Sequence, residues 1–360
     1  MEKVNVVFSP FHLDENKYVQ IMKSLISKKF NVISIKGALK NFSILKSVKI
    51  VHLNWYEALP VSGNMINVVL DFVKKTLFLI TFKFFGAKII WTYHNKMQHE
   101  SNFLILQKMM ISLVLKNSHI ILIHSKISKN ILLKSFPKIK ELEKKVVYLP
   151  HPDYINDYGS VINSNNQTDT RLNLLFLGMI RPYKNLEILL DAVKSFNYDE
   201  VSLKIAGNYT SREYLDNLLN KYGTLKNVTF DVRFIPDNEM SKIIQSCDLL
   251  VLPYDITSSL NSGTVIMAFS YKKTVIVPEI GTVLDYGGSD DILSYSYKST
   301  NGDQHLEVLK KQIRKALDLK ASSNNVFLEK GENVFDMLVR YNSKELIANK
   351  IQNLYTSLLG

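Results

Sequence analysis

Hydrophobic and polar positions in the first 150 residues alternate between short apolar runs and longer stretches with helical periodicity. In residues 17–25, for example, Val19, Met22 and Leu25 lie on one face of a helix. The apolar runs predict strands at residues 4–8, 31–35, 50–54, 88–92, 119–123 and 146–149. Strands that are apolar throughout are typical of a parallel sheet covered by helices on both faces. The first part of the chain is therefore predicted to be an α/β domain.

The alternation stops at residues 156–170, a polar segment rich in Asn, Ser and Thr that we interpret as a linker. It then restarts, and it predicts strands at residues 172–177, 201–206, 228–232, 249–252 and 274–277. Residues 325–359 have the pattern of two helices. The predicted organisation is two Rossmann-like, doubly wound domains with a cleft between them, at residues 1–160 and 171–335. A last segment, residues 336–360, follows the second domain, and the family resemblance described below implies that it crosses back to the first domain.

Composition excludes several classes of protein. The chain has 360 residues, of which 46% are hydrophobic and 22% are charged, so a disordered or collagen-like protein is excluded. Cys247 is the single cysteine, which rules out a disulfide framework within the chain. The amino terminus lacks the pattern of a signal peptide. We therefore expect a protein of the reducing cytoplasm.

The charge is unevenly distributed. Residues 1–150 contain 23 Lys, no Arg and 8 acidic residues, a net charge of +15, whereas the rest of the chain is slightly acidic. Such asymmetry indicates an anionic partner, a nucleic acid or a membrane surface, or only a lysine-rich solvated surface. Nucleic acid is not expected, because the basic half has no known binding motif and no Arg.

Residues 66–90 are the most apolar long segment, but charged residues interrupt it. Asp71, Lys74, Lys75 and Lys83 break it into runs too short to span a bilayer. The mixture of large apolar residues and lysines is typical of a helix that lies on a membrane, and equally of a buried amphipathic helix. If this segment docks on the inner leaflet of the plasma membrane, each nearby Lys contributes roughly 1 kcal/mol.

Residues 172–192 join a predicted strand to a predicted helix through a turn that contains Gly178, Arg181 and Lys184. Glycine lets a backbone approach a ligand closely, and the two cations precede a helix N-terminus, where phosphate binds well. This segment resembles the first strand, turn and helix of the nucleotide domain in glycosyltransferases of the GT-B fold. The resemblance implies that Arg181 and Lys184 bind the diphosphate of the donor.

Residues 247–281 form a second motif of the same kind. A strand ends at Tyr254, and Ser262, Gly263 and Thr264 begin a helix with N–H groups and hydroxyls suited to an anion. This segment resembles GT-B glycosyltransferases too, and in particular a Ser-Gly-Thr form found in bacterial polysaccharide glycosyltransferases. Many retaining members have two Glu residues eight apart here, but this chain has Ser259 and Met267. The resemblance also implies that Ile235 faces the nucleobase.

Polar residues cluster after three predicted strands of the first domain, at residues 9–16, 52–57 and 92–100. The last two clusters resemble the same bacterial enzymes, in which the first domain binds the acceptor and supplies catalytic residues. The resemblance implies acceptor-binding roles for His12, Asp14, Asn16, Trp55, Asn95 and His99.

An inverting transfer needs a base for the acceptor hydroxyl and positive charge for the leaving diphosphate. Glu57 and His94 are our first choices for the catalytic base, followed by Glu100, Asp14 and His12. A retaining route would instead rely on the donor phosphate, with His94 on the donor sugar. No Asp-x-Asp motif and no metal-binding pair of histidines is present, so we expect no metal and no cofactor besides the UDP- or GDP-linked sugar.

The sequence as a whole predicts a GT-B glycosyltransferase that moves a sugar from a nucleotide-diphosphate donor to an acceptor. The expected acceptor is a lipid-linked saccharide in capsule or exopolysaccharide assembly. Two alternatives stay open, a nucleotide-sugar 2-epimerase and an inactive GT-B subunit that binds a partner.

Overall fold

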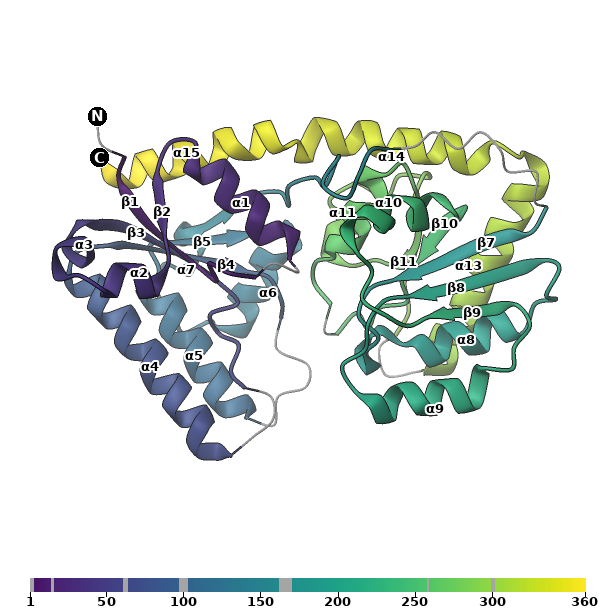
Figure 1. The fold of residues 1–360 in the computed structure, drawn as a ribbon, viewed down its shortest axis with the longest axis horizontal. Helices are drawn as coiled ribbons and strands as arrows, with labels where there is room; N and C mark the ends of the chain where they lie inside the picture. The colour runs from purple at the N-terminus through teal and green to yellow at the C-terminus, as the bar shows by residue number, and fades with distance from the viewer. Residues whose placement is uncertain are drawn as a thin grey trace. The chain divides into compact units, whose positions relative to one another are not determined.

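The computed structural model describes residues 3–13, 16–60, 64–96, 103–161, 170–257, 259–298 and 302–360. The chain forms two compact units. The first unit comprises Met1–Pro152 together with Asn342–Gly360, and the second comprises Asp153–Tyr341. Figure 1 shows the elements of both units.

The first unit is built on a parallel six-stranded sheet in the order β2-β1-β3-β4-β5-β6. The strands are β1 (Asn5–Ser9), β2 (Asn31–Ile33), β3 (Val48–Asn54), β4 (Lys88–Tyr93), β5 (Ile120–Ile123) and β6 (Val146–Tyr148). All six predicted strands are present within one or two residues. The second is shorter than predicted, because the hydroxyl of Ser34 accepts a hydrogen bond from the N–H of Gly37 at 2.9 Å and begins a helix there.

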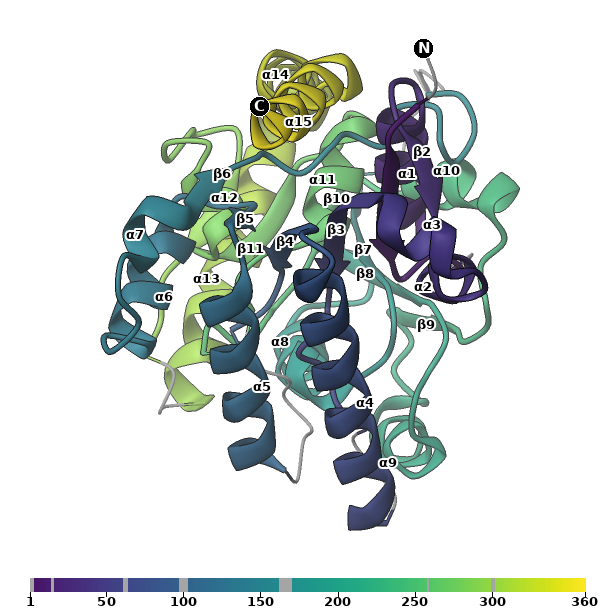
Figure 2. The same ribbon diagram turned by 90° about the vertical axis from the view of Figure 1, so that its left-hand side faces the viewer.

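Helices cover both faces of this sheet, as the apolar strands require. They are α1 (Lys17–Ser27), α2 (Ile35–Leu39), α3 (Phe42–Ser47), α4 (Met65–Phe84), α5 (Leu104–Asn117), α6 (Ile127–Ser135), α7 (Leu142–Lys145) and α15 (Lys344–Leu359). Helices α4 and α5 pack side by side on one face, while α1 and α15 pack together on the other (Figures 1 and 2).

Helix α15 belongs to the first unit although it ends the chain. The side-chain amide of Gln352 donates to the carbonyl oxygen of Leu25 in α1 at 2.7 Å. The hydroxyl of Tyr355 lies 2.6 Å from Nδ1 of His52 in β3, and both side chains are buried. The last helix is therefore part of the core of the first unit.

The second unit has a parallel six-stranded sheet in the order β12-β11-β10-β7-β8-β9. The strands are β7 (Leu172–Leu177), β8 (Val201–Ala206), β9 (Val228–Asp231), β10 (Leu249–Val251), β11 (Val275–Pro278) and β12 (Leu293–Tyr295). The helices are α8 (Leu186–Lys194), α9 (Arg212–Tyr222), α10 (Asp237–Gln245), α11 (Gly263–Ser270), α12 (Gly281–Leu284), α13 (Gly302–Ser322) and α14 (Val326–Asn342). A 3-10 turn, η1 (Pro182–Lys184), precedes α8.

Two parallel six-stranded sheets with covering helices confirm the predicted fold class. In each sheet the order in which successive strands are added reverses once. The reversal lies between β1 and β3 in the first unit and between β7 and β10 in the second. Ligands of doubly wound sheets bind at the carboxyl ends of the strands beside such a point. None of the described helices is both long enough and apolar enough to cross a bilayer.

Candidate functional site

In the second unit the loops after β7 and β10 bring Gly178, Lys184 and Thr264 together. Gly178 has φ +133°, a conformation that favours glycine. A Cβ at this position would lie 2.9 Å from Nζ of Lys184 and 3.8 Å from Oγ1 of Thr264. The lack of a side chain at Gly178 therefore lets a cation and a hydroxyl lie close to the backbone.

Lys184 has an unusual environment for a charged residue. Its side chain is buried, and its Nζ lies 5.3 Å from the ring centre of Tyr254 and 5.7 Å from that of Phe176. No described carboxylate forms an ion pair with it. Burial, with a smaller contribution from the charge of Arg181, lowers the pKa of Lys184 from 10.5 to about 8. Such a cation gains much from a bound anion, since the anion would replace the lost solvation.

Arg181 lies beside Lys184, between β7 and η1. Its Nε is buried and has no hydrogen-bond partner among the described residues. A buried donor without a partner is costly and is frequently explained by a ligand. Arg181 and Lys184 are thus two neighbouring cations with unused hydrogen-bonding capacity.

The N-terminus of α11 adds backbone donors at the same place. The hydroxyl of Ser262 caps α11 by accepting from the N–H of Val265 at 3.2 Å, and it lies 3.0 Å from the hydroxyl of Tyr254. The backbone N–H of Ser262 donates to Oγ1 of Thr282 at 2.9 Å. The first-turn N–H groups, which start at Gly263, have no acceptor within the helix. This end of α11 is therefore held in place and suits an anion.

Tyr297 fixes the loop that follows β10. Its hydroxyl donates to the carbonyl oxygen of Tyr254 at 2.9 Å and accepts from the N–H of Ile256 at 3.1 Å. Its ring stacks on His305 with centres 3.8 Å apart. Neither Tyr297 nor His305 is predicted from the sequence, because both lie far along the chain from the motif that they support.

Ile235 lies elsewhere in the second unit. It is buried in the turn between β9 and α10, and β9 is separated from β7 by β8. Its role at the nucleobase stays a prediction. Met267, which stands at one of the two positions where many retaining members have Glu, is almost entirely buried in α11.

In the first unit the predicted residues Trp55 and His94 lie in contact. Their rings stack with centres 3.9 Å apart. Nε2 of His94 donates to Oδ1 of Asn54 at 3.0 Å, which fixes the orientation of the imidazole. Trp55 has φ +48°, an uncommon backbone conformation for a bulky residue. A strained residue against a buried imidazole at a strand end is a candidate for function.

Three residues that sequence reasoning missed surround His94. Tyr18 of α1 lies within 5.3 Å, ring centre to ring centre, of His94, His124 and His151. His124 follows β5 directly, and His151 follows β6 by three residues. Both lie at strand ends, as do the polar clusters predicted after β1, β3 and β4. Burial lowers the pKa of His94 well below its usual value and that of His124 to about 4. Both are neutral at pH 7 and are weak bases.

Glu57 follows β3 and is enclosed in the first unit. Its Oε2 accepts a hydrogen bond from Nε1 of Trp91 at 2.9 Å. Burial raises the pKa of Glu57 to about 7, although the bond from Trp91 and the charge of Lys75 act in the opposite direction. A carboxyl with a pKa near 7 can accept a proton at neutral pH, and this chemistry favours Glu57 over His94 as the base.

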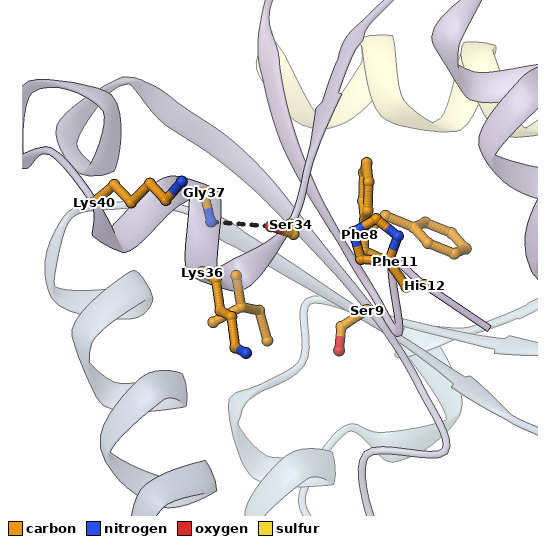
Figure 3. Close-up of a pocket in the computed structure, with 9 residues that line it drawn as sticks. Phe8, Ser9, Phe11, His12, Ser34, Lys36, Gly37 and Lys40 are labelled. Carbon is orange, nitrogen blue, oxygen red and sulfur yellow. Dashed lines mark hydrogen bonds between the residues drawn. The ribbon is translucent and has the colours of Figure 1, made fainter.

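A pocket of about 440 Å³ lies at the ends of β1 and β2. Figure 3 shows Phe8, Phe11 and His12 on one side of it and Lys36 on the other. The predicted acceptor residue His12 therefore lines a real cavity. By contrast, Oδ1 of Asn16 accepts from the N–H of Tyr18 at 3.1 Å and caps α1, which is a structural use of that side chain.

The remaining predicted residues of the first unit are less informative. Asn95 is half-buried just after β4. Asp14, His99 and Glu100 lie outside the described residues. Among the residues that the structure does describe, no three His, Cys, Asp or Glu side chains gather as metal ligands would.

Comparison with known proteins identifies the second unit. The family model "Glycosyl transferases group 1" matches residues 160–326, which include Gly178, Lys184 and the N-terminus of α11. These residues form a glycosyl transferases group 1 domain. The resemblance of the sequence to GT-B glycosyltransferases is thus confirmed.

Proteins of known structure share the fold of this chain over almost its whole length. HepE of Anabaena, solved with UDP and glucose, covers 98% of this chain at 11% identity with a TM-score of 0.68, and all of its own chain is matched. A glycosyltransferase from Rickettsia africae covers 99% of each chain at 16% identity with a TM-score of 0.63.

A curated relative shares more sequence over a shorter segment. A GDP-mannose:glycolipid 4-beta-D-mannosyltransferase of Xanthomonas campestris is 30% identical over 105 residues. The matched segment is 29% of this chain and 30% of that relative.

Proposed function

We propose that this protein transfers a sugar from a nucleotide-diphosphate donor to a saccharide acceptor. The cluster of Gly178, Arg181, Lys184 and the N-terminus of α11 is the observation on which the proposal depends. It combines two cations, backbone donors and a glycine whose backbone lies close to Lys184 and Thr264. This combination suits a diphosphate better than a single carboxylate, because a diphosphate can engage both cations and the helix end at once.

Each unit contains groups that suit one part of the chemistry. As the bond from the sugar to the diphosphate breaks, negative charge grows on the leaving oxygen. Lys184, Arg181 and the α11 N–H groups would stabilise that charge. These groups are in place before the reaction starts, so they need no reorganisation. In an inverting reaction Glu57 would take the proton of the acceptor hydroxyl as that oxygen bonds to the sugar. His94, held by Asn54, would hydrogen-bond to the sugar as a neutral imidazole.

The donor proposed is a UDP- or GDP-linked sugar, with no metal ion or further cofactor. Its diphosphate charge would be met by side chains and the helix end alone. HepE was solved with UDP, and the Xanthomonas relative is named for GDP-mannose, so the relatives support both bases.

The acceptor proposed is a lipid-linked saccharide in the assembly of a surface polysaccharide such as a capsule or exopolysaccharide. The Xanthomonas relative is named for a glycolipid acceptor, which supports this choice. Such an acceptor lies in a membrane, and we therefore propose that the enzyme works as a peripheral protein on the inner leaflet.

An assay of purified protein with UDP- and GDP-sugars tests this function. We expect release of nucleoside diphosphate and a labelled lipid product only when the lipid-linked saccharide is present. Lys184→Met should abolish both signals, while Lys311→Met, at an exposed lysine of α13, should change neither. Conversion of the donor without acceptor would instead indicate the 2-epimerase. Nucleotide binding with no turnover of any donor would contradict the transferase proposal and favour an inactive partner subunit.

A further inference from the structure

Helix α4 exposes a continuous apolar stripe that the fold of its own unit does not use. Its members repeat at intervals of three and four residues, which places them on one side of the helix. They are Ile66, Leu70, Val73, Leu77, Ile80 and Phe84, and their exposed fractions range from 45% to 81%. The opposite side of α4, with Val68, Leu79 and Phe82, is buried against the unit.

The neighbouring helix α5 also exposes large apolar side chains. It packs beside α4 on the same face of the sheet (Figure 2), and its residues Ile105 and Met109 are 76% and 51% exposed. At the other end of α4, Phe85 packs on Phe42 of α3 with ring centres 5.5 Å apart, and Phe42 is exposed as well. We call the α4 stripe with Ile105 and Met109 the α4–α5 face. Large apolar side chains that are exposed on neighbouring helices indicate an interaction site.

The charges around the α4–α5 face indicate a partner with negative charge. The two helices contain five Lys and one acidic residue, Asp71. Asp71 is already paired with Lys75 at 3.0 Å. The other four lysines, Lys74, Lys83, Lys108 and Lys116, are exposed. The face is therefore apolar with a cationic margin and no unpaired anion among its described residues.

We propose that the α4–α5 face is the surface that docks this protein on an anionic lipid bilayer, with the apolar stripe inserted at the headgroup level and the lysines on lipid phosphates. An interfacial helix has this combination of apolar and cationic sides. A second copy of the chain is a poorer partner, because a symmetric contact would bring the same lysines of both copies together. This proposal rests on the proposed function only in that a lipid-linked acceptor requires a membrane.

Flotation with lipid vesicles tests the proposal without any need for sugar transfer, so its failure is distinguishable from failure of the proposed function. Vesicles of equal parts phosphatidylcholine and phosphatidylglycerol should carry the full-length protein, and vesicles of phosphatidylcholine alone should carry far less. Ile66→Ser combined with Leu77→Ser should weaken binding by at least about tenfold, because each removes apolar surface from the inserted stripe. Leu328→Ser, at an exposed leucine of α14, is the matched control and should bind like wild type.

The cationic part of the proposal has its own variants. Lys74→Gln combined with Lys108→Gln should weaken binding to the anionic vesicles by at least about tenfold, as two lysines near an anionic surface would. Lys311→Gln combined with Lys315→Gln, at exposed lysines of α13, should have little effect. A tryptophan introduced as Leu70→Trp should be quenched by brominated phosphatidylglycerol in the same vesicles.

Three results would overturn the proposal. The first is that the wild-type protein does not float with the anionic vesicles. The second is that the serine variants, with circular dichroism spectra like the wild type, float as well as it does. The third is a dimer in sedimentation that Ile66→Ser combined with Leu77→Ser converts to monomer, since this would assign the face to a second copy.

Discussion

Lys184 is predicted to trade stability for ligand binding, and the structure allows the magnitude to be worked out. In the folded protein its pKa falls from 10.5 to about 8 because the side chain is buried and Arg181 is near. At neutral pH the charged form then costs the folded state about 3 kcal/mol, at about 1.4 kcal/mol for each pKa unit. Lys184→Met keeps most of the length of the side chain and removes its charge. We expect it to raise the free energy of unfolding at pH 7 by up to about 3 kcal/mol.

The stability difference between the wild type and Lys184→Met should depend on pH. Between pH 8 and 10.5 the unfolded chain keeps a proton on Lys184 that the folded chain has lost. The wild type therefore gains stability as the pH rises through this window, and Lys184→Met does not. The difference between them should shrink from about 3 kcal/mol at pH 7 to about 1 kcal/mol at pH 9.5. Urea denaturation followed by circular dichroism at both pH values measures it.

Lys320 is the matched control. It is also a buried lysine of the second unit, but its Nζ lies 2.6 Å from Oδ2 of Asp248. Lys320→Met leaves that carboxylate buried without its partner, which costs about 3–5 kcal/mol. The two substitutions should thus act in opposite directions. A Lys184→Met protein that is less stable than wild type at pH 7, or a difference that does not change with pH, would refute the reasoning.

Three further predictions concern other parts of the molecule. Gly178→Ala should abolish nucleotide binding and lower the free energy of unfolding by about 1–3 kcal/mol, because φ is positive there and the new Cβ would meet Lys184. Isothermal titration measures the binding, and urea denaturation measures the stability. Glu57→Gln should stabilise the protein by up to about 3 kcal/mol at pH 8 and by little at pH 4.5. The reason is that the carboxyl of Glu57 loses its proton near pH 7 in the folded protein but near pH 4.5 in the unfolded chain. The difference in urea midpoints between variant and wild type at the two pH values checks the sign. Tyr355→Phe should cost about 1–2 kcal/mol by removing the hydrogen bond that ties α15 to β3, and a thermal melt that does not move would contradict this.

The strands were predictable because most of them are covered on both faces and are thus continuous apolar runs. The pattern is weaker at the sheet edges. β12 has only three residues, one of them the half-buried Ser294, and the sequence did not indicate it. The strand predicted at residues 31–35 ends early because Ser34 caps α2, a local hydrogen bond that apolar periodicity does not register.

The residues of the candidate donor site could be proposed from the sequence, but their geometry could not. A glycine after a strand and cations before a helix pointed to Gly178 and Lys184. Their approach to Thr264, some eighty residues away, depends on β7 and β10 being neighbours in the sheet. In the first unit, Tyr18 lies on an apolar helix face and has the pattern of an ordinary core residue. Only the fold shows that it meets His94.

The central claim is that Arg181, Lys184 and the N-terminus of α11 bind a nucleoside diphosphate. A thermal-shift titration with UDP, GDP, ADP and CMP, applied to the wild type and to Arg181→Ala, tests it most directly. We predict that one diphosphate at about one hundred times its Kd adds about 2.7 kcal/mol to the stability of the wild type and much less to that of the variant. Absence of a shift with every nucleotide, or an equal shift in Arg181→Ala, would contradict the claim.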